Sequence, residues 1–218
     1  TITWSVEGLI DEYIRKARIV KNGKVIEVNA LNQVEEIEFP GVGKLEAFYS
    51  DGLRTLLSTA KDIENMSEKT LRYPGHVEKI KLLRDLGFLD ETPIQLEKTT
   101  IVPRKITVGL LEKKLKKPDV PDILAMRVQV EGTKGDKRVM YSFYILDRYD
   151  EKNKVTAMAR TTAYTASCVT QLLAKKVIKG HGIIPPEKLG GDEDVFKKLV
   201  SMLRKRGVLV RESKKILK

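Results

Sequence analysis

The stretch ILAMRVQVEG (residues 123–132) is followed, after the turn signal GTKGD, by KRVMYSFYILDRYD (residues 137–150). Both runs are rich in β-branched and aromatic residues, which favour strands, and the glycines between them favour a turn. The sequence therefore predicts a long antiparallel hairpin over residues 122–150. Because the two strands are so apolar, we expect both of their faces to be buried, against helices on one side and a second subunit on the other.

Helix signals flank this hairpin on both sides. Apolar residues recur at helical spacing, and Ser5, Gly87 and Pro103 stand where helix ends favour such residues. A second hairpin is expected at Asn22-Gly23, because both residues tolerate a positive φ. Antiparallel strands with segregated helices predict an α+β fold, with a mixed, largely antiparallel sheet and helices packed on it. The predicted helices span residues 5–17, 76–87, 103–115, 159–179 and 192–206.

The composition is that of a soluble globular protein. Of the 218 residues, 41% are hydrophobic and 33% charged, and no apolar run approaches the ~18–20 residues that span a bilayer. No secretion signal opens the chain. Cys168 is the only cysteine, which excludes an intramolecular disulfide and a CxxC metal site, and we expect a cytoplasmic protein. High Lys and Glu content with little Asn, Gln and Cys is typical of thermophilic proteins.

The positive charge is concentrated in the second half of the chain. Residues 1–101 carry a net charge of −3 and residues 102–218 one of +14. Such a basic half is compatible with nucleic-acid binding. The alternative is a set of solvated helix faces and a frayed basic terminus, and we favour it because aromatic residues are not interleaved with the basic runs.

Most enzyme motifs are absent from the sequence. GxGxxG, GxxxxGK[ST], HExxH and GxSxG do not occur, and FPGVGK (residues 39–44) lacks the third glycine of a dinucleotide fingerprint. With one cysteine and two histidines, neither a zinc site nor a papain-like dyad is predicted.

Three loop segments carry polar side chains that their turns do not require: FYSDGLR (48–54), LRYPGH (71–76) and MARTTAYTAS (158–167). Arginines clamp carboxylates, an aspartate can hold an ammonium group and a histidine can move a proton, so such a set suits a small zwitterion. The structural alternatives are that Ser50 or Asp51 is simply a helix N-cap and that His76 packs without a catalytic role. The candidate residues are Tyr49, Asp51, Arg54, Arg72, Tyr73, His76, Arg160 and Thr161.

Arg160 stands in or near the first turn of a predicted helix, where a cation opposes the helix macrodipole. That position is favourable if an anion is bound there by the guanidinium and the free backbone N–H groups, with Thr161 as a further donor. The alternative is that Arg160 pairs with a nearby carboxylate such as Asp147 or Asp150.

Several segments together resemble the C-terminal, substrate-binding part of the saccharopine dehydrogenase family, and they look closest to its lysine 6-dehydrogenase-like members. The resemblance covers nearly the whole chain. The matching segments are TWSVEGLIDEYIRKARIVKNGKVIEV (3–28), EAFYSDGLRTLL (46–57), KTLRYPGHVEKIKLLRDLGFLD (69–90), TAMARTTAYTAS (156–167) and GIIPPEKLG (182–190).

The resemblance implies a two-part oxidoreductase in which an N-terminal Rossmann module binds NAD or NADP. The part that this chain resembles binds the amino-acid substrate and forms a homodimer, so we expect residues 1–180 to be a substrate-binding and dimerisation domain. Residues 181–218 are expected to be a linker, a helix and a basic tail. The chain begins at Thr1 without a methionine or a glycine fingerprint, and we expect it to lack the Rossmann module and to bind no cofactor alone.

The reaction implied is oxidation of a C–N bond, of lysine to its semialdehyde plus ammonia or of a saccharopine-like adduct. The roles implied are Arg72 and Arg160 as carboxylate clamps, Asp51 as ammonium partner and His76 as proton shuttle. The other interpretation is a non-catalytic dimerising module whose site has drifted.

Overall fold

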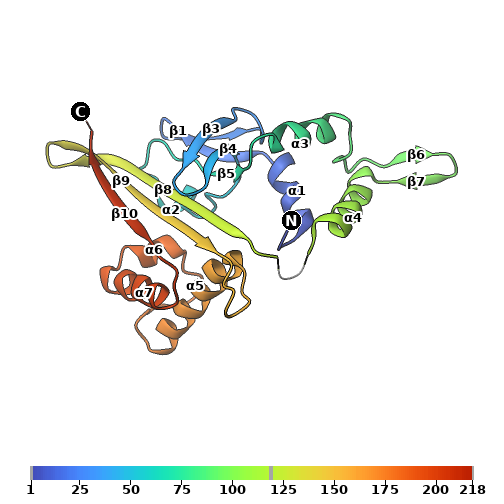
Figure 1. Ribbon diagram of the computed structural model, residues 1–218. Coiled ribbons are helices and arrows are strands. Elements are labelled where there is room, and N and C mark those ends of the chain that lie inside the picture. The colour runs from blue at the N-terminus through green and yellow to red at the C-terminus, as the bar shows by residue number, and fades with distance from the viewer. Residues whose placement is uncertain (1, 118–119, 218) are drawn as a thin grey trace. The chain divides into compact units, whose positions relative to one another are not determined.

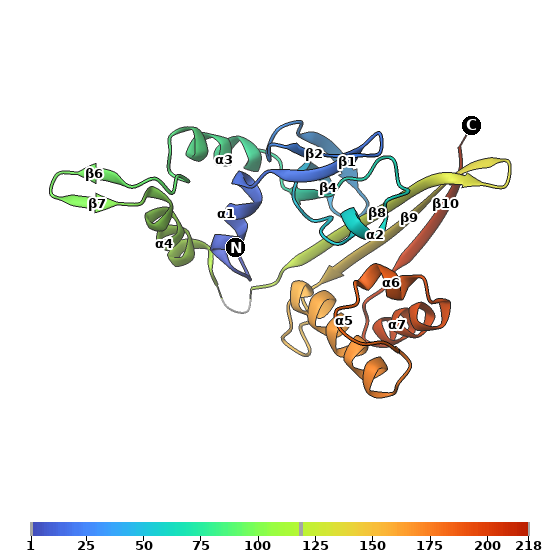
Figure 2. The same cartoon turned by 180° about the vertical axis from the view of Figure 1, so that it is seen from behind.

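The chain divides after residue 118 into two units with separate hydrophobic cores (Figures 1 and 2). The computed structural model describes residues 2–117 and 120–217. In the second unit α7 (Glu193–Lys205) packs on α5 (Ala157–Ala174). The functional division into residues 1–180 and 181–218 stays a prediction.

The described residues of the first unit combine four helices with three small antiparallel sheets, β1-β2, β3-β4-β5 and β6-β7. Its elements in chain order are α1 (Val6–Ile14), β1 (Ala17–Lys21), β2 (Lys24–Val28), β3 (Glu35–Phe39), β4 (Gly43–Tyr49), α2 (Leu56–Thr59), β5 (Lys69–Arg72), α3 (His76–Asp85), β6 (Ile94–Leu96), β7 (Thr99–Ile101) and α4 (Pro103–Leu115).

Local sequence signals account for the ends of these elements. The Ser5 hydroxyl accepts the N–H of Gly8 and caps α1, as predicted. Asn22 and Gly23 have φ values of 51° and 72° and close the β1–β2 hairpin, so this prediction is also confirmed. Pro103 is the first residue of α4.

Helix α1 lies at the centre of the first unit's core. Its inward face buries Val6, Leu9, Ile10 and Tyr13, and the apolar faces of α3 and α4 pack against the same cluster. The ring centroids of Tyr13 and Phe48 are 5.8 Å apart, which ties α1 to β4. Burying one face of α1 therefore brings its remaining turns beside β4 and β5.

The second unit is a three-stranded antiparallel sheet, in the order β10-β9-β8, with three helices. Its hairpin joins β8 (Ile123–Lys134) to β9 (Lys137–Arg148) through a turn at residues 135–136, as predicted. Its other elements are α5, α6 (Pro186–Gly190), α7 and β10 (Arg211–Ile216). The overall α+β class is confirmed.

Two expectations about the second unit are corrected. The basic tail was expected to fray, but residues 211–216 form β10 and pair in register with β9 from Arg211↔Tyr144 to Ile216↔Val139. The linker before the last helix contains the short helix α6. Within this unit β8 is mostly exposed, and β9 buries only Val139, Ser142, Ile145 and Asp147, so burial of both strands on both faces is not seen in the single chain.

No helix in the described ranges is long and apolar enough to cross a membrane. The same residues contain no group of three or more His, Cys, Asp or Glu side chains that could hold a metal ion.

A chain that ends at Val210 lacks β10 and leaves the outer edge of β9 open. We expect a loss of at least about 1 kcal/mol in the stability of the second unit, because six cross-strand pairs are removed. Hydrogen exchange at the amides of residues 139–144 measures it, and exchange should accelerate there. Unchanged exchange rates at these amides would contradict the pairing.

Candidate functional site

A hollow of about 400 Å³ opens in the first unit between α1 and the ends of β4 and β5. We call it the Trp4 hollow. Eight of its lining residues have ionisable or hydroxyl-bearing side chains. Its lining residues are Trp4, Gly8, Asp11, Glu12, Arg15, Ser50, Asp51, Gly52, Arg54, Glu68 and Thr70.

A larger hollow, of about 520 Å³, lies in the second unit. It is lined by lysines, aliphatic side chains, Asp192 and Asp194 around the start of α7, and it includes none of the residues predicted for the site. The Trp4 hollow contains Asp51 and Arg54, so the chemistry predicted from the sequence points to the smaller cavity.

Two glycines give the Trp4 hollow its walls. A Cβ at Gly8 would lie 3.0 Å from the Trp4 ring, and a Cβ at Gly52 would lie 2.6 Å from the carboxyl carbon of Glu68. Their missing side chains therefore leave room for an indole on one side and a carboxyl group on the other.

Glu68 is held against the turn that follows β4. The Ser50 hydroxyl donates to Glu68 Oε2 at 2.5 Å and lies 2.7 Å from the Thr70 hydroxyl. Burial raises the pKa of Glu68 above its ordinary value, although the hydrogen bond from Ser50 opposes the shift. A cation bound in the hollow would therefore stabilise the ionised form of Glu68.

Glu12 contributes a second half-buried carboxyl group from α1. Burial raises its pKa, the nearby Glu68 adds to the shift, and Arg72 opposes it. Arg72 Nη2 donates to Glu12 Oε2 at 2.6 Å. Two carboxyl groups from different elements thus share the hollow, and Glu68 raises the cost of ionising Glu12.

Behind Glu12 a chain of hydrogen bonds leads to His76. Arg72 Nε donates to the Tyr13 hydroxyl at 3.3 Å, and this hydroxyl lies 2.8 Å from His76 Nε2. Burial lowers the pKa of His76, and the neighbouring Arg72 lowers it further. The imidazole is therefore neutral near pH 7 and can accept a hydrogen bond from the Tyr13 hydroxyl.

The turn Pro74-Gly75 holds His76 at the first residue of α3. Gly75 has a φ of 78°, and its N–H and that of Val77 donate to the Glu46 carboxylate at 2.8 and 3.0 Å. Glu46 on β4 thus occupies the amides at the start of α3. The imidazole is left to contact Tyr13, whose ring centroid lies 5.6 Å away.

Asp51 lines the hollow but is already paired. Arg18 donates to its two carboxylate oxygens at 2.9 Å each, and Arg54 Nη1 lies 3.3 Å from Oδ2. The hydrogen bond from the Arg18 side chain is the main reason that the pKa of Asp51 lies below its ordinary value. Asp51 is therefore an ionised anchor that fixes two guanidinium groups.

Tyr49 and Tyr73 lie outside the hollow. Tyr49 is covered by Lys69, whose ammonium group is 4.6 Å from the ring centroid. Tyr73 is 61% exposed.

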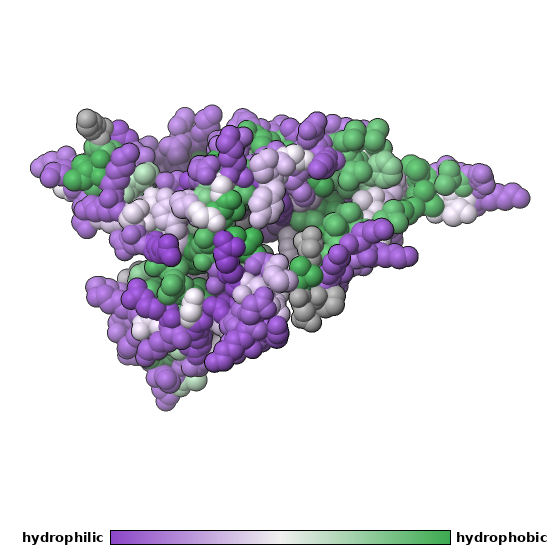
Figure 3. Space-filling model, in the orientation of Figure 1, coloured by the Kyte–Doolittle hydropathy of each residue, from purple (hydrophilic) through white to green (hydrophobic). Residues whose placement is uncertain are grey.

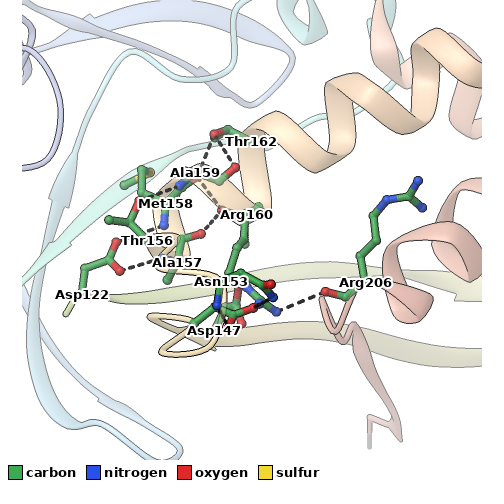
Figure 4. A network of polar contacts seen from close by, with 12 residues as sticks. Asp122, Asp147, Asn153, Thr156, Ala157, Met158, Ala159, Arg160, Thr162 and Arg206 are labelled. Atoms are coloured by element: carbon green, nitrogen blue, oxygen red, sulfur yellow. Dashed lines mark hydrogen bonds and ion pairs between the residues drawn. The ribbon is translucent and has the colours of Figure 1, made fainter. Parts of the chain in front are cut away.

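Arg160 belongs to the second unit, where it holds carboxylates of its own surroundings (Figure 4). Its Nε donates to Asp147 at 2.9 Å, its Nη1 donates to Asp150 at 2.6 Å, and its Nη2 donates to the carbonyl of Arg206 at 3.3 Å. This is the ion-pair alternative that the sequence left open. A role for Arg160 as a substrate clamp stays a prediction.

The first turn of α5 is also occupied by side chains of the chain itself. Asp122 accepts the N–H groups of Ala157 and Met158 at 2.6 and 3.0 Å, and Thr156 accepts that of Ala159 (Figure 4). Thr161 donates to the carbonyl of Ala157 at 2.9 Å. The Asp122 carboxylate thus accepts the backbone N–H groups to which we expected an anionic ligand to bind.

Sequence reasoning missed Trp4, Glu12 and Glu68. Glu12 lies within an amphipathic helix and Glu68 precedes a short strand, positions where glutamates are usually solvated. Only the packing of α1 beside β4 and β5 turns both carboxyl groups toward one cavity, so no local signal marks them.

The family model for the saccharopine dehydrogenase C-terminal domain matches residues 1–208. The chain belongs to this family. Its fold is similar to that of apo histidine-tagged saccharopine dehydrogenase (L-Glu forming) from Saccharomyces cerevisiae, with a TM-score of 0.74 and 16% sequence identity over 98% of this chain. The chain spans 62% of the length of the yeast chain.

Membership of the saccharopine dehydrogenase family confirms the resemblance inferred from the motifs and makes this a dehydrogenase-type domain. The residues present do not fit a dinucleotide cofactor. All named strands of the described ranges pair antiparallel, and no glycine-rich turn joins a strand to a helix N-terminus there as Rossmann folds require.

Replacement of Arg160 by Met leaves Asp147 and Asp150 without their cation. We expect the second unit to lose at least about 2 kcal/mol of stability, because hydrogen bonds to buried charged groups are lost. Hydrogen exchange of the α5 amides measures the loss. The matched control is Arg204→Met at an exposed position of α7, which should leave exchange unchanged; equal effects of both would contradict the role assigned to Arg160.

Replacement of Glu68 by Gln tests the burial of its carboxyl group. A raised folded-state pKa means that the folded chain binds more protons than the unfolded chain just above pH ~4.5, so Glu68 becomes unfavourable as the pH rises through that window. We expect Glu68→Gln to be more stable than the wild type at pH 7–8 and equal to it near pH 4. Unfolding in urea, followed by the fluorescence of Trp4, the single tryptophan, measures the difference. Exposed Glu27→Gln is the control, and a Glu68→Gln variant less stable than wild type at pH 8 would contradict the prediction.

Proposed function

We propose that this chain is the substrate-binding and dimerisation part of an NAD(P)-dependent amino-acid dehydrogenase that acts on C–N bonds. The favoured reaction converts lysine to its semialdehyde and ammonia, and the second candidate substrate is a saccharopine-like adduct. Family membership supports the dehydrogenase class, and the charge distribution of the Trp4 hollow supports an amino-acid substrate.

The observation that carries the proposal is the pair of half-buried carboxyl groups, Glu12 and Glu68, in one cavity. Burial disfavours their ionised forms, and a substrate ammonium group would restore the balance by supplying an opposite charge. The Trp4 ring offers an apolar and cation-binding wall beside them. The pocket therefore suits an aliphatic amine better than an anion.

Arg54 is the residue that we propose for the substrate carboxylate. Its guanidinium is 58% exposed at the rim of the hollow and is fixed from behind by Asp51. A guanidinium held by one carboxylate keeps donors for a second one. Asp51 then acts as an anchor for Arg54 and Arg18, in place of the direct ammonium contact expected from the sequence.

His76 is proposed as the proton acceptor, and its Nε2 lies 2.8 Å from the Tyr13 hydroxyl. The pair of contacts Arg72–Tyr13 and Tyr13–His76 links it to Glu12 at the cavity wall. Arg72 positions Glu12 and Tyr13 in this proposal. The site roles of Tyr49, Tyr73, Arg160 and Thr161 stay predictions from the motifs.

The remaining parts of the proposal rest on the family. NAD or NADP would be held by an N-terminal Rossmann module and not by this chain, and the enzyme would be a cytoplasmic homodimer of lysine metabolism from a thermophilic source. Reaction is expected only when that module and this chain are together.

The proposal is tested by titrating the chain with L-lysine while the fluorescence of Trp4 is recorded. We expect saturable binding of lysine and weaker binding of norleucine, which has the same backbone but no side-chain amine. A Glu12→Gln, Glu68→Gln double variant should lose at least about tenfold in affinity, because a charged hydrogen bond is worth roughly 1.5–3 kcal/mol. Glu27→Gln is the control.

Saccharopine is titrated in the same way, and lysine- or saccharopine-dependent reduction of NAD(P) is assayed in a protein that joins this chain to a dinucleotide-binding module. If neither amino acid changes the Trp4 signal or the melting temperature, the chain is the non-catalytic dimerising module of the alternative hypothesis. Binding without any reduction of NAD(P) would support the substrate pocket and contradict the proposed reaction.

A further inference from the structure

The larger hollow of about 520 Å³ belongs to the second unit and shares no lining residue with the Trp4 hollow. Its walls come from the segment between α5 and α6, from α6 itself and from the start of α7. Small-molecule sites typically measure about 300–1,000 Å³. We call this cavity the lysine hollow. Its lining residues are Lys176, Val177, Ile178, Lys179, Ile184, Lys188, Leu189, Asp192, Asp194, Val195 and Lys198.

The apolar walls of the lysine hollow are part of the core of the second unit. Ile178 and Val195 are buried in one hydrophobic cluster, and Val177 and Leu189 pack against it. Core packing therefore maintains the shape of the hollow, and its charged side chains are attached to a fixed frame.

Both carboxylates of the hollow already have partners within the chain. Asp192 accepts the N–H groups of Asp194 and Val195 at 3.1 Å each and so caps α7. Asp194 pairs with Lys198 at 2.5 Å. The two negative charges are thus bound to backbone amides and to one lysine, and neither pairs with the other three lysines.

Those three lysines, Lys176, Lys179 and Lys188, are all exposed. None of them forms an ion pair with a carboxylate of residues 2–117 or 120–217. With four lysines and two aspartates, the lining of the hollow carries a net charge of +2. A bound anion lowers the energy of such an excess of cations around one concave surface.

Lys176 stands at a backbone position that usually favours glycine. Its φ is 55°. Its N–H donates to the Leu173 carbonyl at 2.9 Å, and the N–H of Val177 donates to the Leu172 carbonyl at 2.9 Å. These two bonds close α5 with a Schellman motif, in which the left-handed residue is most often glycine.

Helices α3 and α7 end with the same motif but have glycine at this position. Gly87 and Gly207 both have a φ of 80°, and a side chain is disfavoured in that conformation. The helix macrodipole favours a cation near a helix C-terminus, but Lys175 already supplies one at the preceding residue. The side chain of Lys176 therefore needs another explanation, and its place in the lining of the hollow supplies one.

We propose that the lysine hollow binds a small molecule that carries two or more phosphate groups, held by Lys176, Lys179 and Lys188. Lysine binds phosphate as a compact point charge, and three ammonium groups suit a ligand with several negative charges. Figure 3 shows hydrophilic side chains over the part of the second unit that contains α6 and α7, so the ligand would enter from water. The site is separate from the proposed function, which rests on the Trp4 hollow.

The lining of the hollow favours a small ligand over a nucleic-acid strand. None of the eleven lining residues is aromatic, so the bases of a single strand would have no side chain on which to stack. The apolar walls can instead contact the organic part of a small phosphorylated molecule.

The test is isothermal titration calorimetry of the 218-residue chain with sodium tripolyphosphate, at about 50 mM salt. We expect saturable binding with a Kd below about 1 mM. The variant Lys176→Gln/Lys179→Gln/Lys188→Gln should bind at least roughly tenfold more weakly, because three charged contacts are removed.

The matched control is Lys137→Gln/Lys152→Gln/Lys205→Gln. It removes the same charge from the second unit at exposed positions outside the hollow, and it should bind tripolyphosphate like the wild type. Circular dichroism checks that both triple variants are folded.

A single substitution, Lys176→Gly, separates a role in binding from a role in the backbone. Glycine is favoured at this left-handed position, so the variant should melt at a higher temperature than the wild type. Its affinity for tripolyphosphate should nevertheless fall at least roughly threefold. A lysine that only closes α5 would leave the affinity unchanged, and this result would overturn the role assigned to Lys176.

Three further results would overturn the proposal. The first is the absence of any heat of binding up to about 10 mM tripolyphosphate. The second is equal weakening in the triple variant and its control, which would indicate a diffuse effect of charge. The third is a single-stranded oligonucleotide that binds through the same three lysines when tripolyphosphate does not, which would assign the surface to nucleic acid. Lysine binding at the Trp4 hollow is decided independently of all three.

Discussion

The ion pair between Glu12 and Arg72 links α1 to β5, and the arrangement of the Trp4 hollow depends on it. Arg72 binds the carboxyl group that faces the cavity and also the Tyr13 hydroxyl, which in turn contacts His76. One guanidinium thereby sets the position of a pocket wall and of an imidazole on another helix. Because α1 also provides the central residues of the core, this one helix fixes the position of the hollow relative to the core.

Charge satisfaction distinguishes anchors from groups that can still bind a ligand. Asp51, Arg72 and Arg160 all have strong partners within the chain. Glu12 is itself the partner of Arg72, and Glu68 accepts a hydrogen bond from Ser50, yet burial raises the pKa of both carboxyl groups and a bound cation would lower it. Carboxyl groups with a raised pKa select a ligand by its charge, whereas ion pairs such as those of Asp51 and Arg160 hold the surrounding structure rigid.

Much of the fold follows from local sequence signals. Ser5, Asn22-Gly23, Gly87 and Pro103 each mark an element boundary, because caps, turns and fixed φ values act over a few residues. The edge pairing of β10 was missed, since a run such as RESKKI has the composition of a solvated tail and is held only by its pairing with β9.

The candidate site was less accessible to such reasoning. The motifs pointed to Asp51, Arg54, Arg72 and His76, and the first two do line the hollow while the others lie directly behind its wall. Glu12 and Glu68 could not be predicted from the sequence, because their partial burial results from tertiary packing. Arg160 shows the opposite case. A cation near a helix N-terminus, which opposes the macrodipole, is neutralised here by carboxylates that lie nearby in the sequence.

The strand order β10-β9-β8 also determines when each strand can pair during translation. The hairpin β8–β9 can close as soon as residue 148 has left the ribosome, but the outer edge of β9 stays open until residue 211 has been made. In that interval the segment that forms α5 to α7 emerges, and its packing against β9 can precede the last strand. An open edge during translation is a site for wrong pairing with other nascent chains. The lysines and the arginine of β10 give that late strand a charge that discourages pairing with copies of itself.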